Sequence, residues 1–459
     1  AGTPQLGLAC LGLILFFTLA HMPAHLWAAV AVCAAVLSRI MVAGTGLPSS
    51  INFVHFPLAL AAGGLAFLFG QNHTSLTRKM ELGLGAFLVL CGLSTAINGG
   101  EIARPILTWM VFSEPFLILY AILRTLRSKK EMNFLWILLF FCAFVQVPLA
   151  IFQAIVFGSG DPTGGTFIGM SSASHTCGGV ALIGVIGTFG KAIQTKNTRS
   201  RFFWVSGGVL LLSTPILSDA KQAIVAFVVS ALLFSFGLIR NIGRKRFPLL
   251  LLLLLCVITF TTFSLSSGFQ SYWRNVATIP EGLQGKKESI RIIFQHLYEK
   301  PGGLFVGLGP GNSVSRVGLM AHPGYGKEDS PVGILGLKEA PTTQAVMAST
   351  ESNWIWTQSS LWNGISSWNG LIGDVGIFGL ALYLFLCLIL VIHSPPRAPA
   401  QSYVLKTTLL MTGILAAVSS WLEEPGFTLP AVLLIGLTLL EKDPSTGKAS
   451  STNQLPVQS

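Results

Sequence analysis

Charge is scarce in this sequence. Asp, Glu, Lys and Arg make up 10% of the residues, whereas soluble globular domains carry about 25%. Hydrophobic residues make up 52%, and the mean hydropathy is +0.68. Many runs have no charge over the length that crosses a bilayer, and a lone segment in lipid must satisfy its own backbone hydrogen bonds by forming a helix. The composition excludes a soluble domain and predicts an all-α polytopic membrane protein.

Metal and disulfide motifs are also missing. The seven cysteines lie in or beside apolar runs without CxxC spacing, and the long polar stretch 269–370 contains none. They are expected to act as small packing residues rather than as ligands or bridges. No histidines and carboxylates show metal-ligand spacing, so we expect no catalytic metal and no other cofactor.

Two classes of ligand are excluded by missing signals. Gly307-Leu-Gly-Pro-Gly-Asn312 lacks the Walker spacing and the following Lys-Ser/Thr, which argues against nucleotide binding. Its glycines instead predict a tight chain reversal. The net charge of +11 lies mostly in short loops, where it sets membrane orientation, so it does not predict nucleic-acid binding.

About thirteen apolar runs are predicted to cross the membrane. They cover roughly residues 6–20, 24–43, 53–70, 80–97, 105–123, 133–157, 177–192, 202–217, 221–239, 247–268, 371–393, 405–421 and 425–440. No cleavable signal peptide is expected, because the first run has no basic region before it.

Basic residues recur in every second loop. They are Arg78, Lys79, Arg124, Arg127, Lys129, Lys130, Lys191, Lys196, Arg199, Arg201, Arg240, Arg244, Lys245, Arg246, Arg397 and Lys406. The positive-inside rule assigns these loops to the cytoplasm and leaves one long loop on the outer face. The expected organisation is an N-terminal bundle (1–268), a long periplasmic loop (269–370), C-terminal membrane helices (371–442) and a disordered cytoplasmic tail (443–459).

The long loop is predicted to contain one amphipathic helix. Lys286–Lys300 has apolar residues at spacings that share one face. Such a helix is suited to lie on membrane lipids or to cap the bundle, and Pro301-Gly-Gly303 ends it. From His322 to Ala348, Gly and Pro are frequent and periodicity is weak, so we expect an irregular flap.

Basic residues on the outer side are candidates for binding a diphosphate. Lys221 opens a helix after a turn that contains Asp219, and the pair can hold a phosphate or lie paired at the membrane interface. Lys286 and Arg291 form a second basic group, which suits a diphosphate or anionic lipid head groups. Arg274 is similar, in a less specific context.

Aromatic and amide residues alternate near the end of the loop. Trp362 and Trp368, with Asn369, belong to this pattern. Aromatic faces and amides suit the binding of an acceptor sugar, and an aromatic belt at the membrane interface is the alternative interpretation. His322, in the expected flap, is a candidate base.

Four segments stand in a characteristic order. They are Gly164-Gly-Thr-Phe-Ile-Gly169, the turn Ser218-Asp-Ala-Lys221, the amphipathic helix followed by Glu299-Lys-Pro301 and Gly307-Leu-Gly-Pro-Gly-Asn312, and Ile365-Ser366 nine residues before Gly376-Ile-Phe-Gly379. With the long outer loop, their order resembles the O-antigen ligase and O-antigen polymerase superfamily of bacterial membrane glycosyltransferases. The resemblance covers about residues 130–440.

The sequence departs from that family at two motifs. The closing motif of ligases begins with a histidine thought to act at the acceptor, and this position is Ile365, followed by Ser366 in place of asparagine. Lys221 replaces the usual arginine of the turn, which keeps the charge but loses the bidentate fork. The pattern fits a polymerase-type or diverged member better than a ligase.

The resemblance implies a fold of the C-type glycosyltransferases and a metal-independent reaction. A glycan would pass from a polyprenyl-diphosphate-linked donor to an acceptor sugar at the outer face of the bacterial cytoplasmic membrane. Lys221, with Lys286 or Arg291, would neutralise the leaving diphosphate. Asp374, Asp219 or His322 would act as base, or none is needed. The alternatives are a ligase with a lipid or protein acceptor, a small-anion transporter and a non-catalytic scaffold.

Overall fold

The computed structural model describes residues 22–160, 162–169, 173–242, 254, 284–323, 330–353, 365–394 and 398–441; within 236–242, it describes the side chain of Leu238 alone. These residues form α-helices and short 3-10 helices, with no strand among them. The predicted spans 6–20 and 247–268, the candidate residues Arg274 and Trp362, and the tail 443–459 lie outside the described residues.

The helices run in the following order. They are α2 (Ala24–Thr45), η1 (Ser49–Phe53), α3 (His55–Phe69), α4 (Ser75–Asn98), α5 (Ala103–Thr125), α6 (Lys129–Phe144), α7 (Gln146–Phe157), η2 (Gly165–Phe167), α8 (Ala173–Gln194), α9 (Thr198–Leu217), α10 (Lys221–Ile242), α13 (Gln284–Glu299), α14 (Gly303–Val306), α15 (Arg316–Met320), α16 (Pro331–Ile334), α17 (Pro341–Glu351), α19 (Ser367–Ile392), α20 (Pro399–Val418), η4 (Trp421–Glu423) and α21 (Pro425–Leu440).

The described part of the chain has nine helices that are long and apolar enough to cross a membrane, and two shorter apolar helices. Together these correspond to the eleven predicted spans that fall on described residues. In this count α6 and α7 form one span, and η1 extends α3. The prediction of a multi-pass helical membrane protein is confirmed.

Local sequence signals explain where several helices begin and end. Thr74 caps α4 by accepting a hydrogen bond from Thr77 N, and Ser128 caps α6 in the same way with Glu131. Each pair is a capping box, in which two otherwise unpaired donors are satisfied. Gly46 ends α2 in the left-handed region, with φ 69°.

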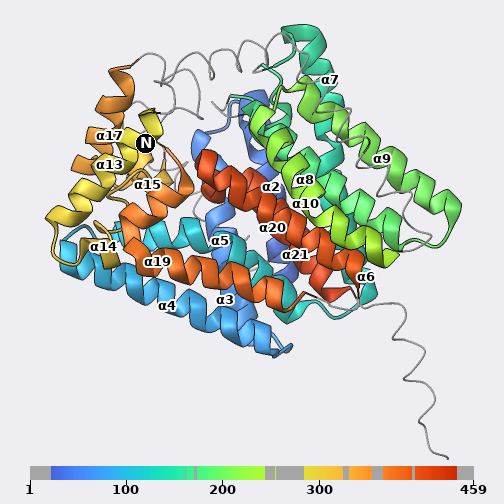
Figure 1. The fold of residues 1–459 in the computed structure, drawn as a ribbon, viewed down its shortest axis with the longest axis horizontal. Helices are drawn as coiled ribbons and strands as arrows, with labels where there is room; N and C mark the ends of the chain where they lie inside the picture. The colour runs from blue at the N-terminus through green and yellow to red at the C-terminus, as the bar shows by residue number, and fades with distance from the viewer. Residues whose placement is uncertain are drawn as a thin grey trace, which may run out of the picture.

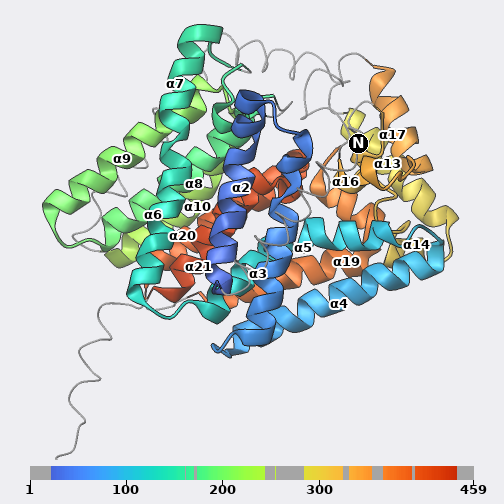
Figure 2. The ribbon, with the colours of Figure 1, turned by 180° about the vertical axis from the view of Figure 1, so that it is seen from behind.

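Helices α4 and α19 pack antiparallel along their lengths, as Figures 1 and 2 show. At one end, Ser94 Oγ donates to the carbonyl of Asp374 (3.3 Å), and at the other Ser75 Oγ lies 3.1 Å from His393 Nε2. Gly83 allows α4 and α19 to approach closely, because a Cβ at this position would lie 2.6 Å from a leucine of α19.

Helix α8 is the most buried of the long helices, with neighbours α6, α9, α10, α20 and α21. Small residues on α8 let these neighbours approach. A Cβ at Gly184 would lie 2.5 Å from Ala143, and one at Gly190 would lie 2.5 Å from Val404. Helices in lipid associate through such close packing, because lipid tails are as apolar as the side chains themselves.

The helices of the polar stretch gather at one end of the bundle, beside α4, α5 and α19 (Figures 1 and 2). The predicted amphipathic helix is confirmed as α13, which buries Ile293 and Leu297 in a cluster with Val346 of α17. The predicted irregular flap is wrong over its second part, where α17 forms. Pro341 at the first helical turn preorganises the backbone of α17, and packing against α13 stabilises it.

Candidate functional site

The turn η4 lies at the centre of the candidate site, between α20 and α21. Leu422 N donates to Ser367 Oγ (3.0 Å), and Ser367 N donates to the carbonyl of Ser419 (3.1 Å). Trp421 packs edge to face against Phe427, with ring centroids 4.9 Å apart. These contacts join the start of α19, the end of α20 and the start of α21.

Lys286 of α13 reaches this junction. Its Nζ donates to the carbonyls of Val418 (2.7 Å) and Ile365 (3.1 Å). Val418 is the last residue of α20, so its carbonyl lies at the negative end of a helix. Burial lowers the pKa of Lys286 to about 8, because a desolvated ammonium is less stable than one in water.

Arg316 and Glu423 make a second contact across the junction. Arg316 donates its backbone N–H to Glu423 Oε2 and its Nη1 to the Glu423 carbonyl, and Nη1 lies 3.5 Å from Glu424 Oε2. Burial raises the pKa of Glu423 to about 8, against the effect of the Arg316 N–H, and Asp374 adds to the rise. Glu423 Oε1 is buried and has no hydrogen-bond partner among the described residues.

The glycine-rich run 307–312 packs against a break in α19. Gly376 interrupts the helix with φ 68° and ψ −168°. A Cβ there would lie 2.4 Å from the backbone of Phe305, and a Cβ at Gly307 (φ 82°) would lie 2.3 Å from the backbone of Asp374. Both positions require glycine, because the backbone is left-handed and a second backbone is in contact. Two glycine motifs that are far apart in the sequence therefore form one interface.

Asp374 stabilises this interface between α19 and the glycine-rich run. Its side chain is fully buried, and its oxygens accept hydrogen bonds from Gly311 N (2.8 Å) and Ser313 N (2.9 Å). Arg104 of α5 donates to the carbonyl of Gly311 (2.9 Å) from the other side. Both carboxylate oxygens of Asp374 are thus engaged in holding the glycine-rich run.

The turn that precedes α10 holds the predicted pair Asp219 and Lys221. The two charged groups lie 2.6 Å apart, and Asp219 adopts a left-handed φ of 51°. Ala220, between them, packs on α8, since a Cβ at Gly178 would lie 2.3 Å from the Ala220 Cβ. The next residue, Gly179, faces Trp421 of η4. Consecutive residues of α8 therefore contact this turn and η4.

The segment η2 is held by two amides of α7. Gln153 Oε1 accepts from the first N–H of η2 (2.7 Å), and Gln146 Oε1 accepts from the second (3.0 Å). Phe167 is fully buried against the start of α21, where a Cβ at Gly426 would lie 2.4 Å from its ring. Three segments of the family-like pattern therefore contact η4 or the helix ends that it joins, and the fourth, the turn before α10, contacts α8 next to the residue that faces η4.

Other predicted residues lie apart from these contacts. Arg291 is on the outward face of α13, where its side chain is 61% exposed and its Nη2 lies 2.6 Å from Glu288 Oε1. His322 Nε2 lies 3.6 Å from Glu339 and 3.8 Å from Glu351.

The remaining predicted sugar-binding residues lie at the start of α19. Trp368 Nε1 donates to the carbonyl of Gly413 (3.1 Å), and its ring packs edge to face on Tyr383. Asn369 donates its backbone N–H to Ser366 Oγ, which caps the helix. Trp368 is therefore directed towards α20, while the Asn369 side chain is partly exposed.

The residue selection from sequence missed several charged groups. Arg316 and Glu423 connect the polar stretch to η4, and His55 Nδ1 lies 2.6 Å from Glu114 Oε1 between α3 and α5, with both side chains buried. The available signal was a charge within or next to an apolar run, because such residues are costly in a membrane protein. Only the fold identifies their partners.

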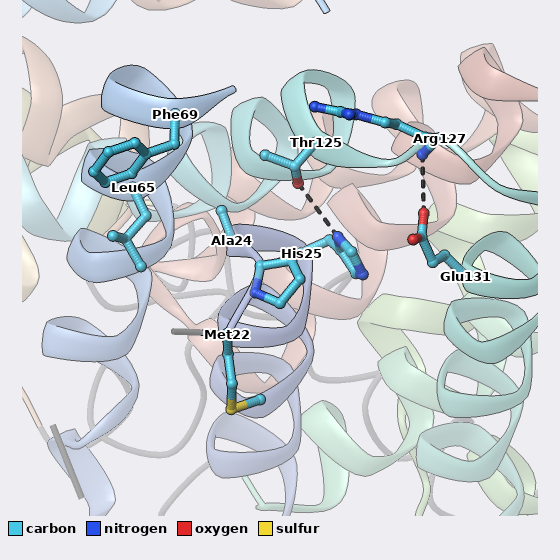
Figure 3. Close-up of a pocket in the computed structure, with 9 residues that line it drawn as sticks. Met22, Ala24, His25, Leu65, Phe69, Thr125, Arg127 and Glu131 are labelled. Atoms are coloured by element: carbon cyan, nitrogen blue, oxygen red, sulfur yellow. Dashed lines mark hydrogen bonds between the residues drawn. The ribbon is translucent and has the colours of Figure 1, made fainter. Parts of the chain in front are cut away.

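A pocket of about 490 Å³ lies away from η4, where α2 and α6 begin and α3 and α5 end (Figure 3). His25 Nδ1 lies 3.5 Å from Thr125 Oγ1 across it, and Glu131 accepts a hydrogen bond from Arg127 N (3.0 Å). None of the predicted site residues lines it.

No protein-family model matches the chain, and no curated protein matches it in a sequence search. Within the described residues, no group of three His, Cys, Asp or Glu side chains is arranged to hold a metal ion. The sequence pattern and the geometry around η4 are therefore the features that indicate a function.

Proposed function

We propose that this protein is a membrane polysaccharide polymerase, which transfers a glycan from a polyprenyl-diphosphate donor to an acceptor sugar at the outer face of the bacterial cytoplasmic membrane. One observation carries the proposal. Of the four segments that resemble the O-antigen ligase and polymerase superfamily, three contact η4 or the ends of the helices beside it, and the turn before α10 contacts α8 one residue away from Gly179, which faces η4. Sequence segments that matched the family only by chance would not be expected to lie together in the fold.

In the proposed reaction, an acceptor hydroxyl oxygen attacks the anomeric carbon of the donor. The bond from that carbon to the diphosphate oxygen breaks, and the acceptor proton passes to water or to a carboxylate. Negative charge grows on the leaving diphosphate, so fixed cations nearby lower the barrier. Lys221 and Lys286 are assigned this role.

The surroundings of Lys286 support its selection over Arg291. The lowered pKa of Lys286 reflects a partly desolvated charge, and such a charge gains more from an anionic partner than a solvated charge does. Arg291 faces outward and is already paired with Glu288. Of the two candidate loop cations, Lys286 is the one that contacts the start of α19 through Ile365.

The environment of Ile365 supports a polymerase over a ligase. Its side chain is buried in an apolar cluster with Leu319 and Met347, and its carbonyl accepts the Lys286 hydrogen bond. A packing residue thus occupies the position of the ligase histidine. Glu423 is not assigned the role of proton acceptor, because burial raises its pKa to about 8 and it is mostly protonated at neutral pH.

A small-anion transporter is the second candidate. The buried contact between His55 and Glu114, on two membrane-spanning helices, favours it, because ionisable groups inside membrane bundles often belong to ion or proton pathways. Transport would move an anion without forming a glycosidic bond.

Glycan analysis of cells that lack the protein tests the proposal. Cells complemented with the wild type should make long chains, whereas Lys221→Ala should leave single repeats. Lys79→Ala is the matched control. Lys79 is an exposed lysine near the start of α4, whereas the end of α4 contacts the glycine-rich run, so this variant should restore long chains. Full-length chains that stay on the lipid carrier would indicate a ligase. Unchanged glycans in the deletion would reject glycan transfer and make anion flux the next measurement.

A further inference from the structure

An apolar tip projects from the polar stretch at α16. The exposed residues 333–336 read Gly-Ile-Leu-Gly and carry no charge. Ile334 is 67% exposed and Leu335 is 51% exposed, while Val332 and Leu337 on either side are buried. The tip therefore directs two large apolar side chains outward from a short, well-anchored turn.

The tip lies beside the membrane-spanning part of α5 rather than beyond its end. Val332 and Leu337 pack in one cluster with Val111 of α5 and Phe56 of α3, and Figure 2 shows α16 beside α5. Val111 is eight residues after the first residue of α5, which is about 12 Å along a helix axis. The tip is thus level with a segment that is long and apolar enough to lie in lipid.

The backbone N–H groups of the tip are already paired. Gly333 N donates to Ser330 Oγ (3.0 Å), and the N–H groups of 334, 335, 336 and 337 donate to carbonyls of 330, 331, 333 and 332. Backbone groups that enter lipid must find partners within the protein, because no water is available there. The N–H groups of the turn meet this requirement through hydrogen bonds within the turn.

The neighbouring surface is apolar as well. On α5, Ile106 is 49% exposed, and Ile102 just before the helix is 80% exposed. Exposed apolar side chains on a membrane-spanning helix face lipid, so the surface next to the tip is a lipid-facing one. Lys338 follows the tip and is exposed, where its ammonium can reach phosphate head groups while its stem lies along apolar surface.

We propose that residues 333–336 are a membrane anchor, in which Ile334 and Leu335 insert among the acyl chains of the nearer leaflet. Arg104 joins the anchor to the candidate site, because it donates to the carbonyls of Lys338 and Gly311. The anchor fixes the height of the glycine-rich run above the lipid. This inference does not depend on the proposed catalytic activity.

Site-specific labelling tests the anchor in the full chain. Ile334→Cys is introduced after replacement of the native cysteines, labelled with the fluorophore NBD, and reconstituted as single copies in nanodiscs of phosphatidylcholine and phosphatidylglycerol. Leu68→Cys, on α3 and 69% exposed, is the lipid-facing reference. Gln344→Cys, on the exposed face of α17, is the water-facing reference. Quenching by lipids that carry an acyl-chain nitroxide is compared with quenching by iodide in water.

At Ile334, the nitroxide lipids should quench several-fold more strongly than at Gln344, and iodide several-fold less. Leu335→Cys repeats the measurement if the first variant does not fold. Quenching at both tip positions equal to that at Gln344 would overturn the anchor. Protection from both quenchers would also overturn it and would show that the tip is covered by protein, since a single copy per nanodisc excludes a second chain.

Discussion

The two faces of α13 place similar charges in opposite surroundings. Lys286 points inward, where its ammonium contacts the carbonyls of Ile365 and Val418. Arg291, five residues later, points outward and pairs with Glu288 in solvent. Both side chains carry one positive charge, so the difference in their surroundings comes from which face of the helix each residue occupies.

The inward face belongs to a region where side chains contact backbone groups of distant segments, as Asp374 does with Gly311. Breaking a buried contact of this kind costs about 1–3 kcal/mol per unpaired group. Exposed ion pairs contribute about 0–1 kcal/mol. Matched substitutions in the two regions should therefore differ in size even when the chemistry is the same.

Gly376→Ala should show the largest difference. Its free energy of unfolding should fall by about 4 kcal/mol, because φ 68° with ψ −168° costs a non-glycine residue about 1–3 kcal/mol and crowding adds about 1–3 kcal/mol. Gly302→Ala is the outward control, since Gly302 has φ 72° and open space around the new Cβ. It should lose only the conformational part. Thermal unfolding in detergent measures both, and equal losses would mean that the contact with Phe305 contributes nothing.

Most of the helical fold was predictable from local properties. Runs without charge marked the eleven described spans, and apolar spacing marked α13. Helix α17 was missed because Thr, Ser and Ala dominate Pro341–Glu351 and give weak periodicity. Its signal was Pro341 at the first turn, but its stability comes from α13, which is about fifty residues away in sequence.

The site was predictable only in part. The sequence selected Asp374 and both glycine motifs, but their mutual contact depends on how α19 breaks at Gly376. It also left Lys286 and Arg291 undecided, because charge alone does not specify which side chain turns inward. Glu423 was missed for the same reason: its burial and its partner Arg316 come from tertiary packing.

Asp374→Asn and Glu288→Gln compare carboxylates of the two regions without changing side-chain shape. The amide introduced by Asp374→Asn can accept from one of the two backbone donors, so the other is left unpaired. The expected loss in the free energy of unfolding is about 2 kcal/mol. Glu288→Gln weakens an exposed ion pair and should lose less than about 1 kcal/mol. Denaturant titration in micelles distinguishes the two, and a neutral Asp374→Asn would contradict the anchoring role.

The last comparison concerns the opposite titration of Glu423 and Glu288. The pKa of Glu423 is raised from 4.5 to about 8, so the folded state keeps a proton that the unfolded state releases. Stability from this group is complete below pH 4.5 and is lost as the pH rises towards 8, by at most about 1.4 kcal/mol per pH unit.

Glu423→Gln should remove that decline, whereas Glu288→Gln should not. The pKa of Glu288 is lowered, first by its hydrogen bond with Arg291, so its contribution is present above its usual pKa and is lost only in acid. Unfolding is measured from about pH 5 to 8, because above pH 8 the lowered pKa of Lys286 adds a rise in stability. If stability declines with pH in Glu423→Gln as steeply as in the wild type, Glu423 does not cause the decline and is ionised in the folded protein. The junction at η4 would then hold a charged carboxylate, as the outward face of α13 does at Glu288.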